Sequence, residues 1–178
     1  MATAALELFG TRGYDAVSAA EIAARAGVTE RTFFRHFPSK REVLFDGEAV
    51  LRDALIEAIA EIPVDTAPLT ALLRSFHAIT PLLEANRSFA EPRQQIVERT
   101  PALAERELAK IAALTGTLAQ TLRKRGVNDP AAIVAAHAAM GVFVQATVAW
   151  LADHEPGLDT HLSRATAALK GLITEDVS

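Results

Sequence analysis

The chain of 178 residues contains no cysteine, which excludes disulfides, thiolate metal sites and cysteine nucleophiles. It also has no uninterrupted run of about 18 apolar residues, the length that a membrane-spanning helix needs. No basic segment followed by a short apolar stretch opens the sequence, as a secretion signal would require. We therefore expect a cytoplasmic protein without a membrane segment.

Strand patterns are nearly missing as well. Alternation of polar and apolar β-branched residues is rare in this chain, which is rich in alanine and leucine. The predicted fold class is all-α, with a small N-terminal module at residues 1–46, a long helix, and a helical bundle within residues 47–178. Capping residues, prolines and glycines predict nine helices. They lie near residues 2–11, 18–26, 29–36, 40–62, 67–84, 87–97, 101–125, 130–153 and 158–173.

Capping signals mark several of these helix starts. Ser18 followed by Glu21, and Ser39 followed by Glu42, fit the capping box, in which each side chain satisfies a backbone N–H of the other residue. Asp129 precedes a proline suited to the first helical position, so we expect it to cap the next helix.

Charge is distributed unevenly along the chain. The formal net charge is −4, yet residues 1–41 carry six basic and four acidic groups, and the remainder carries 12 basic and 18 acidic groups. This asymmetry mildly favours an N-terminal segment that faces nucleic acid. Its small positive charge alone would bind phosphates weakly, so we expect two copies to act together.

The segment 18–36 has the pattern of two short helices joined by a tight turn. Gly27 supplies the left-handed backbone that such a turn needs. Ala23 is small where the helices cross, and Phe33 with Phe37 forms an inward apolar stripe on the second helix. An ordinary helical hairpin with a glycine turn would show the same spacing, so spacing alone leaves both interpretations open.

The flanking residues extend this pattern. In order, they are Ala5-x-x-Leu8-Phe9-x-x-x-Gly13-Tyr14, then Ile22-Ala23-x-x-Ala26-Gly27-Val28, then Thr32-x-Phe34-Arg35-His36-Phe37-Pro38-Ser39-Lys40-x-x-x-Leu44. This run closely resembles the signature of the tetracycline-repressor (TetR) family. The resemblance implies a helix-turn-helix DNA-binding module at residues 1–46 and an effector-binding and dimerisation domain at 47–178. It also implies a sequence-specific regulator of transcription, a homodimeric repressor released from a palindromic operator by a small, largely apolar effector.

Residue roles follow from the resemblance, position by position. Family residues at the places of Glu30, Arg31 and Arg35 approach base edges, and arginine suits a bidentate contact with guanine. Those at the places of Ser18, Thr32, Phe34, His36 and Lys40 approach phosphates. Thr29, which can cap the second helix, completes the predicted DNA-binding set. Phe34 stands where tyrosine is common, so a hydroxyl contact to phosphate would be absent.

Two C-terminal segments predict the dimer interface. Residues 131–152 are almost entirely apolar, and a helix that is apolar all round must be buried all round. One side can pack on its own domain and the other on a second copy. Together with the helix at 158–173, it predicts a two-fold interface of four helices. A monomer with a buried central helix is the alternative.

Polar residues on apolar helices are candidates for the effector site, since such sites are mostly apolar with a few polar groups. The predicted ligand-binding residues are Phe76, His77, Phe89, Gln94, His137, Met140, Val144 and Gln145. For each histidine, a satisfied core or interface position is the competing interpretation.

Two other classes of protein stay open. A small helical enzyme has little support, because the sequence shows no phosphate-binding glycine loop, no metal-spaced cluster and no nucleophile motif. We accordingly predict no catalytic residues, no metal and no cofactor. A helical dimeric scaffold without DNA binding is the other alternative, and it predicts no salt-dependent association with DNA.

Overall fold

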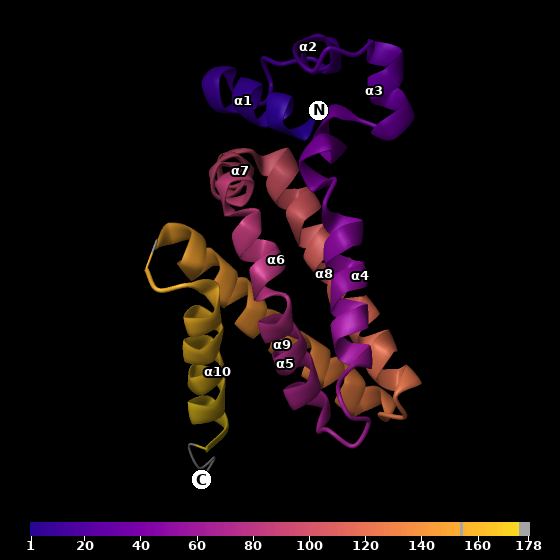
Figure 1. The fold of residues 1–178 in the computed structure, drawn as a ribbon, viewed down its shortest axis with the longest axis vertical. Helices are drawn as coiled ribbons and strands as arrows, with labels where there is room; N and C mark the ends of the chain where they lie inside the picture. The colour runs from indigo at the N-terminus through magenta and orange to yellow at the C-terminus, as the bar shows by residue number, and fades with distance from the viewer. Residues whose placement is uncertain (154, 175–178) are drawn as a thin grey trace. The chain divides into compact units, whose positions relative to one another are not determined.

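The computed structural model describes residues 1–153 and 155–174, except for the side chains of residues 173 and 174. Over these residues the chain forms ten α-helices, one 3-10 helix (η1) and no strand, which confirms the all-α prediction (Figure 1). The elements are α1 (Ala2–Arg12), α2 (Ala19–Arg25), α3 (Glu30–His36), η1 (Lys40–Phe45), α4 (Glu48–Ala60), α5 (Pro68–Ala78), α6 (Thr80–Ala85), α7 (Arg87–Arg99), α8 (Pro101–Lys124), α9 (Asp129–Ala152) and α10 (Leu158–Thr174).

Two predicted single helices are each divided in the structure. The predicted helix at 40–62 consists of η1 and α4, separated at Asp46 and Gly47, because glycine disfavours the helix interior. The predicted helix at 67–84 consists of α5 and α6, separated at Ile79. Pro81 lies in the first turn of α6, where its missing N–H is tolerated, whereas a helix continuing through it would be broken.

Two of the predicted caps are wrong. Ser39 makes no side-chain capping bond, because the backbone N–H of Glu42 donates to the Ser39 carbonyl, at 3.2 Å; the Glu42 carboxylate, the other half of the predicted capping box, binds Arg106. The cap of α9 is Asn128, whose side chain accepts from the backbone N–H of Ala131 at 3.1 Å, and Asp129 is the first helical residue.

The chain divides into two compact units. Unit 1 contains residues 1–49 and 88–110, and unit 2 contains residues 50–87 and the chain from residue 111 onward. The division therefore falls inside α4, α7 and α8. The predicted functional boundary after residue 46 stays a prediction, but packing groups the sequence-remote segment 88–110 with the N-terminal helices.

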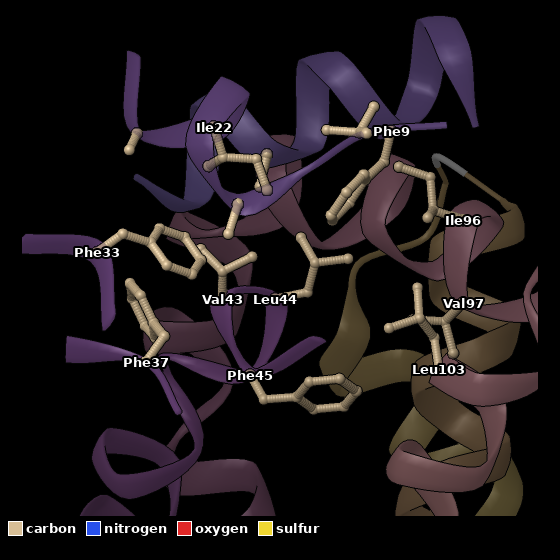
Figure 2. Packing of buried hydrophobic residues seen from close by; sticks show 14 residues of the cluster. Phe9, Ile22, Phe33, Phe37, Val43, Leu44, Phe45, Ile96, Val97 and Leu103 are labelled. Carbon is tan, nitrogen blue, oxygen red and sulfur yellow. The ribbon is translucent and has the colours of Figure 1, made fainter. Parts of the chain in front are cut away.

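Unit 1 is built around an apolar cluster that joins the N-terminal helices to the segment 88–110. Phe33 and Ile22 are fully buried in it, and Phe9 is 2% exposed. Val97 of α7 and Leu103 of α8 belong to the same cluster (Figure 2). Burial of such side chains contributes about 1.5–3 kcal/mol each. Ile96, Val97 and Leu103 thus complete a core whose other members come from residues 5–45.

Unit 2 has its own core, in which α9 packs against α5 and α10. Phe76 of α5 is fully buried and lies against Phe143 of α9, with ring centroids 4.6 Å apart. Arg125 ties the end of α4 to this core by donating to the carbonyls of Ile59 and Ile62, at 2.8 and 2.9 Å.

Helix α9 is long and apolar enough to cross a membrane by length and composition, with a mean hydropathy of 1.7 over its most apolar window. Ten of its residues are nevertheless buried in the core of unit 2. The core helix of a soluble protein meets the same criteria of length and composition. Helix α9 is therefore packed as a core helix of unit 2.

Candidate nucleic-acid interface

Helices α2 and α3 form the predicted helix-turn-helix. Gly27 has a φ of 71°, the left-handed conformation expected of the turn. The turn is closed by the backbone N–H of Val28, which donates to the carbonyl of Ala23 at 3.0 Å. Ala23 is 1% exposed where the two helices pack, so a larger side chain would force them apart.

Both helices begin at well-made caps. The backbone N–H of Glu21 donates to the Ser18 hydroxyl at 3.2 Å, and the Ser18 N–H donates to the Glu21 carboxylate at 2.8 Å. This confirms the predicted capping box of α2. Thr29 caps α3 as predicted, accepting from the N–H of Thr32 at 3.2 Å. These caps fix the start of each helix and therefore the direction in which α3 presents its side chains.

The two faces of α3 differ sharply. Phe33 is fully buried and Phe37 is 6% exposed, with ring centroids 5.3 Å apart, so they anchor the inner face. On the outer face, Arg31 and Arg35 are exposed, and neither makes a hydrogen bond or ion pair with any described residue. Phe34 lies beside them with 48% of its surface exposed. The two guanidinium groups on the outer face of α3 therefore have their N–H donors available for a ligand.

The remaining predicted DNA-contact residues lie on or next to this surface. Ser18, Thr29, Glu30 and His36 are exposed, and Thr32 is half-buried. Their predicted contacts to DNA stay predictions, but the structure gathers them on α3 and at the starts of α2 and α3.

Lys40 makes contacts inside unit 1 in addition to its predicted phosphate contact, which stays a prediction. Its ammonium donates to the carbonyls of Tyr14 and Val17, at 2.8 and 2.9 Å, and lies 4.2 Å from the centroid of the Tyr14 ring. Two of its three N–H groups are thus used inside unit 1, and only the third is left for a phosphate. No local sequence pattern indicates these bonds, because the partners lie 26 and 23 residues away.

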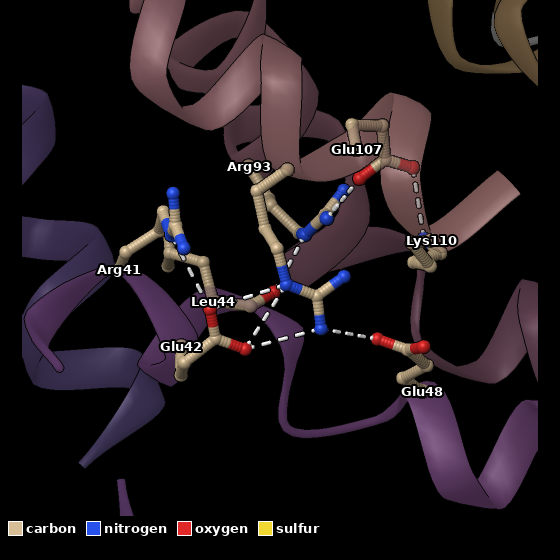
Figure 3. Close-up of polar contacts among 8 residues, drawn as sticks. Arg41, Glu42, Leu44, Glu48, Arg93, Glu107 and Lys110 are labelled. Atoms are coloured by element: carbon tan, nitrogen blue, oxygen red, sulfur yellow. Dashed lines mark hydrogen bonds and ion pairs between the residues drawn. The ribbon is translucent and has the colours of Figure 1, made fainter. Parts of the chain in front are cut away.

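Sequence reasoning also missed a cluster of charged residues in unit 1. Arg106 donates to Glu42 at 3.1 Å and to Glu48 at 2.6 Å, and Arg93 donates to the carbonyl of Leu44 at 2.7 Å (Figure 3). The guanidinium carbons of Arg93 and Arg106 lie 4.7 and 4.6 Å from the centroid of the Phe45 ring. Residues of α7 and α8 are thereby bound to η1 and the start of α4.

The charges in this cluster are partly buried and mutually compensated. Glu107 accepts from Arg93, and from Lys110 at 2.8 Å. Burial alone would raise the pKa of Glu107, but Lys110 and Arg93 lower it below its ordinary value. Burial lowers the pKa of Lys110 in spite of Glu107. Arg93 and Lys110 therefore favour the ionised form of the Glu107 carboxylate.

The predicted effector residues are divided between the two units. Phe89 and Gln94 belong to unit 1, and Gln94 donates to Glu98 at 2.9 Å. The other six belong to unit 2. There, Phe76 and Met140 are buried, whereas His137 and Gln145 are exposed, and His77 is bound to Asp159. A common site for these residues stays a prediction, as does the role of Val144, which is half-buried.

Comparison with family sequence models covers most of the chain. The model of the bacterial regulatory proteins of the tetR family matches residues 2–46, and that of the MftR C-terminal domain matches residues 66–173. The HTH-type transcriptional regulator TcmR of Streptomyces glaucescens is 32% identical over 149 residues, which cover 77% of this chain and 66% of TcmR. The chain thus spans slightly less than two thirds of that relative's length.

Solved structures share the fold. One is FadR of Thermus thermophilus, a TetR-family transcriptional repressor in complex with lauroyl-CoA. It has a TM-score of 0.61 and 24% identity, covering 99% of this chain and 95% of that one. Another is NalD, the secondary repressor of the MexAB-OprM multidrug efflux pump in Pseudomonas aeruginosa, with a TM-score of 0.55, 21% identity and the same coverages. Two family models match this chain, one over the helix-turn-helix and one over most of the helical remainder. The chain therefore belongs to the tetR family of bacterial regulatory proteins.

Proposed function

We propose that this chain is a cytoplasmic, homodimeric repressor of transcription that binds a palindromic operator. The observation that carries the proposal is the outer face of α3, where Arg31 and Arg35 are exposed and unpaired among the described residues. Side chains that no internal partner holds can form bidentate bonds with guanine in the major groove. Membership of the tetR family supports the same function.

Base contacts and phosphate contacts have separate roles in this proposal. Arg31 and Arg35 specify guanines in each half-site, and Glu30 orients an arginine or accepts from a cytosine amine. Ser18, Thr32 and His36 bind phosphates, which fix the register of the helix but carry no base preference. Each lost base contact should cost about 1–3 kcal/mol at one position.

Two copies are needed because dimers present their recognition helices about 34–36 Å apart, one turn of DNA. The outer face of α9 supports such an interface. Val134 is 67% exposed and Val148 41% exposed on a helix whose other side is core. We propose that α9 and α10 of two copies form the four-helix interface.

An apolar effector is proposed to release the operator. FadR of Thermus thermophilus was solved with lauroyl-CoA, and this likeness supports an effector with an apolar chain. The proposed site is in unit 2, near Phe76 and Met140. A thermal-shift screen of acyl compounds tests this, and the absence of any stabilising acyl compound would contradict it.

A gel shift tests the proposed function directly. The probe is DNA from upstream of the chain's own gene, at several salt concentrations. We expect a retarded complex with two chains per palindrome and an affinity that falls as salt rises. A helical dimer that retards no palindrome would support the scaffold alternative and overturn the proposal.

A further inference from the structure

Unit 1 contains a cleft whose position differs from that of the proposed effector site. Its volume is about 520 Å³, within the range of small-molecule sites. We name it the α1–α7 cleft. One wall includes Leu6, Phe9 and Tyr14, from α1 and the turn after it, and the other includes Pro92, Ile96 and Arg99, from α7. Both walls belong to unit 1.

The floor of the α1–α7 cleft suits an aromatic ring. Phe9 is 2% and Ile96 9% exposed, and both belong to the apolar cluster of unit 1 (Figure 2). The rings of Phe9 and Tyr14 are tilted by 57°, with centroids 5.1 Å apart. A third ring can add to this arrangement, because aromatic pairs favour such edge and offset contacts.

The charges on the cleft are arranged on different walls. Arg12 is already compensated, because it donates to the Glu21 carboxylate at 2.7 Å and to the Ala16 carbonyl at 3.0 Å. Arg99 is exposed on the α7 wall and makes no hydrogen bond or ion pair with any described residue. Asp15 lies on the opposite wall, next to Tyr14, where its charge helps burial to raise the pKa of the phenol.

The α7 wall is therefore positive without an acidic partner. Thr100 and Pro101 continue this wall, and Pro101 is the first residue of α8, a helix of 24 residues. With Arg12 compensated by Glu21, Arg99 is the cationic group that the cleft offers to an anion, directly beside an apolar floor.

We propose that the α1–α7 cleft binds a small aromatic carboxylate, with the ring over Phe9 and Ile96 and the carboxylate on Arg99. An occupant would contact both walls at once. One wall leads directly through residues 14–17 to Ser18, the cap of α2, and the other is the sequence-remote part of unit 1. Binding here would stabilise unit 1 and alter DNA affinity without involving unit 2.

The chain supplies two natural probes for the test. Tyr14 is the only tyrosine and lines the cleft, whereas Trp150 is the only tryptophan and belongs to unit 2. In protein labelled at both rings for NMR, 1-naphthoate should shift the Tyr14 signal saturably and leave Trp150 in place. Naphthalene-1-methanol, with the same rings and no charge, should bind about tenfold more weakly.

Variants assign the anionic contact. Arg99→Ala should weaken naphthoate binding about tenfold. Arg99→Lys should restore part of the affinity, since lysine keeps the positive charge but lacks the paired N–H donors of the guanidinium group. Arg164→Ala, which removes an exposed arginine of unit 2, is the matched control and should bind as the wild type does.

Three results would overturn the proposal. The first is an NMR signal of Tyr14 that does not shift at millimolar naphthoate. The second is binding of the alcohol, or of 1-naphthylmethylamine, that is as tight as binding of naphthoate. The third is a shift of the Trp150 signal alone. These signals do not depend on DNA, so a chain that fails to bind its operator can still bind naphthoate. The two proposals can therefore fail separately.

Discussion

Lys40 and Tyr14 are joined by two interactions, a hydrogen bond of 2.8 Å from the ammonium to the Tyr14 carbonyl and a contact of 4.2 Å with the ring centroid. The same ammonium donates to the carbonyl of Val17, the residue before the α2 cap. A side chain from η1 therefore holds the connection between α1 and α2 in place. Lys40 fixes the start of the helix-turn-helix, whether or not it also binds a phosphate.

Replacing Lys40 by methionine should lower stability and leave the salt dependence of DNA binding unchanged. Bonds from a charged donor are worth about 1.5–3 kcal/mol, and partial exposure reduces this to roughly 1–2 kcal/mol. The checks are thermal unfolding and the slope of log K against log salt. A slope reduced by about one, with unchanged stability, would show that Lys40 acts as a phosphate contact instead.

Replacing Glu21 by glutamine should have an effect that depends on pH. The bond from the Ser18 N–H, with help from Arg12, lowers the pKa of Glu21 to about 2 from an ordinary 4.5. Because the folded pKa is depressed, the stabilisation is complete above pH 4.5 and is lost as pH falls toward 2.

The stability gap between wild type and Glu21→Gln should therefore be largest near neutral pH and should close below pH 4.5. Glutamine can still serve in a capping box, so the comparison isolates the charge. Denaturant unfolding at a series of pH values measures the gap. Glu57→Gln, at an exposed carboxylate without a described partner, is the control, and a gap independent of pH would contradict the account.

Replacing Arg93 by alanine should destabilise unit 1 strongly. The side chain is 11% exposed, it binds Glu107 and the Leu44 carbonyl, and it lies over Phe45. Removing one partner of a buried pair costs about 3–5 kcal/mol, and we expect roughly 2–4 kcal/mol at this partly exposed site.

Arg52→Ala removes an exposed pair with Asp53, 2.9 Å apart, and should cost less than about 1 kcal/mol. Chemical denaturation followed by circular dichroism compares the two variants. Equal losses would mean that the cluster around Phe45 adds nothing beyond a surface ion pair.

Replacing Val134 by glutamate should separate the proposed dimer and weaken DNA binding, although the substitution lies outside unit 1. Val134 is 67% exposed on α9. A charge buried at a two-fold interface is placed there twice, without a partner. Val64→Glu is the matched control, because Val64 is 71% exposed but lies between α4 and α5. Light scattering should show monomers for the first variant only; a dimer in both would exclude α9 from the interface.

The N-terminal module could be predicted from the sequence because its signals are local. Ser18 and Glu21 are three residues apart, and Gly27 marks the turn, so caps and turn chemistry suffice. The division of the predicted helix at 40–62 was missed because its apolar pattern continues through Asp46 and Gly47. Periodicity alone does not show that a helix tightens into a 3-10 turn and restarts.

The rest of unit 1 depends on contacts that are distant in sequence. Arg106 binds Glu42 across 64 residues, and Arg93 binds the Leu44 carbonyl across 49. Nothing in the local pattern distinguishes these arginines from the solvated charges of an amphipathic helix. Half of the capping box predicted from Ser39 and Glu42 is absent for the same reason, since the distant Arg106 binds the Glu42 carboxylate.

The most direct test of the account is operator binding by Arg35→Ala, measured by fluorescence anisotropy on a set of operators with single base changes. Wild type should discriminate at each contacted guanine by about 1–3 kcal/mol. The variant should lose discrimination at one position in each half-site and keep it elsewhere. An equal loss of affinity on every sequence would show that Arg35 binds only phosphate, and would contradict the assignment of the outer face of α3 as the base-contacting surface.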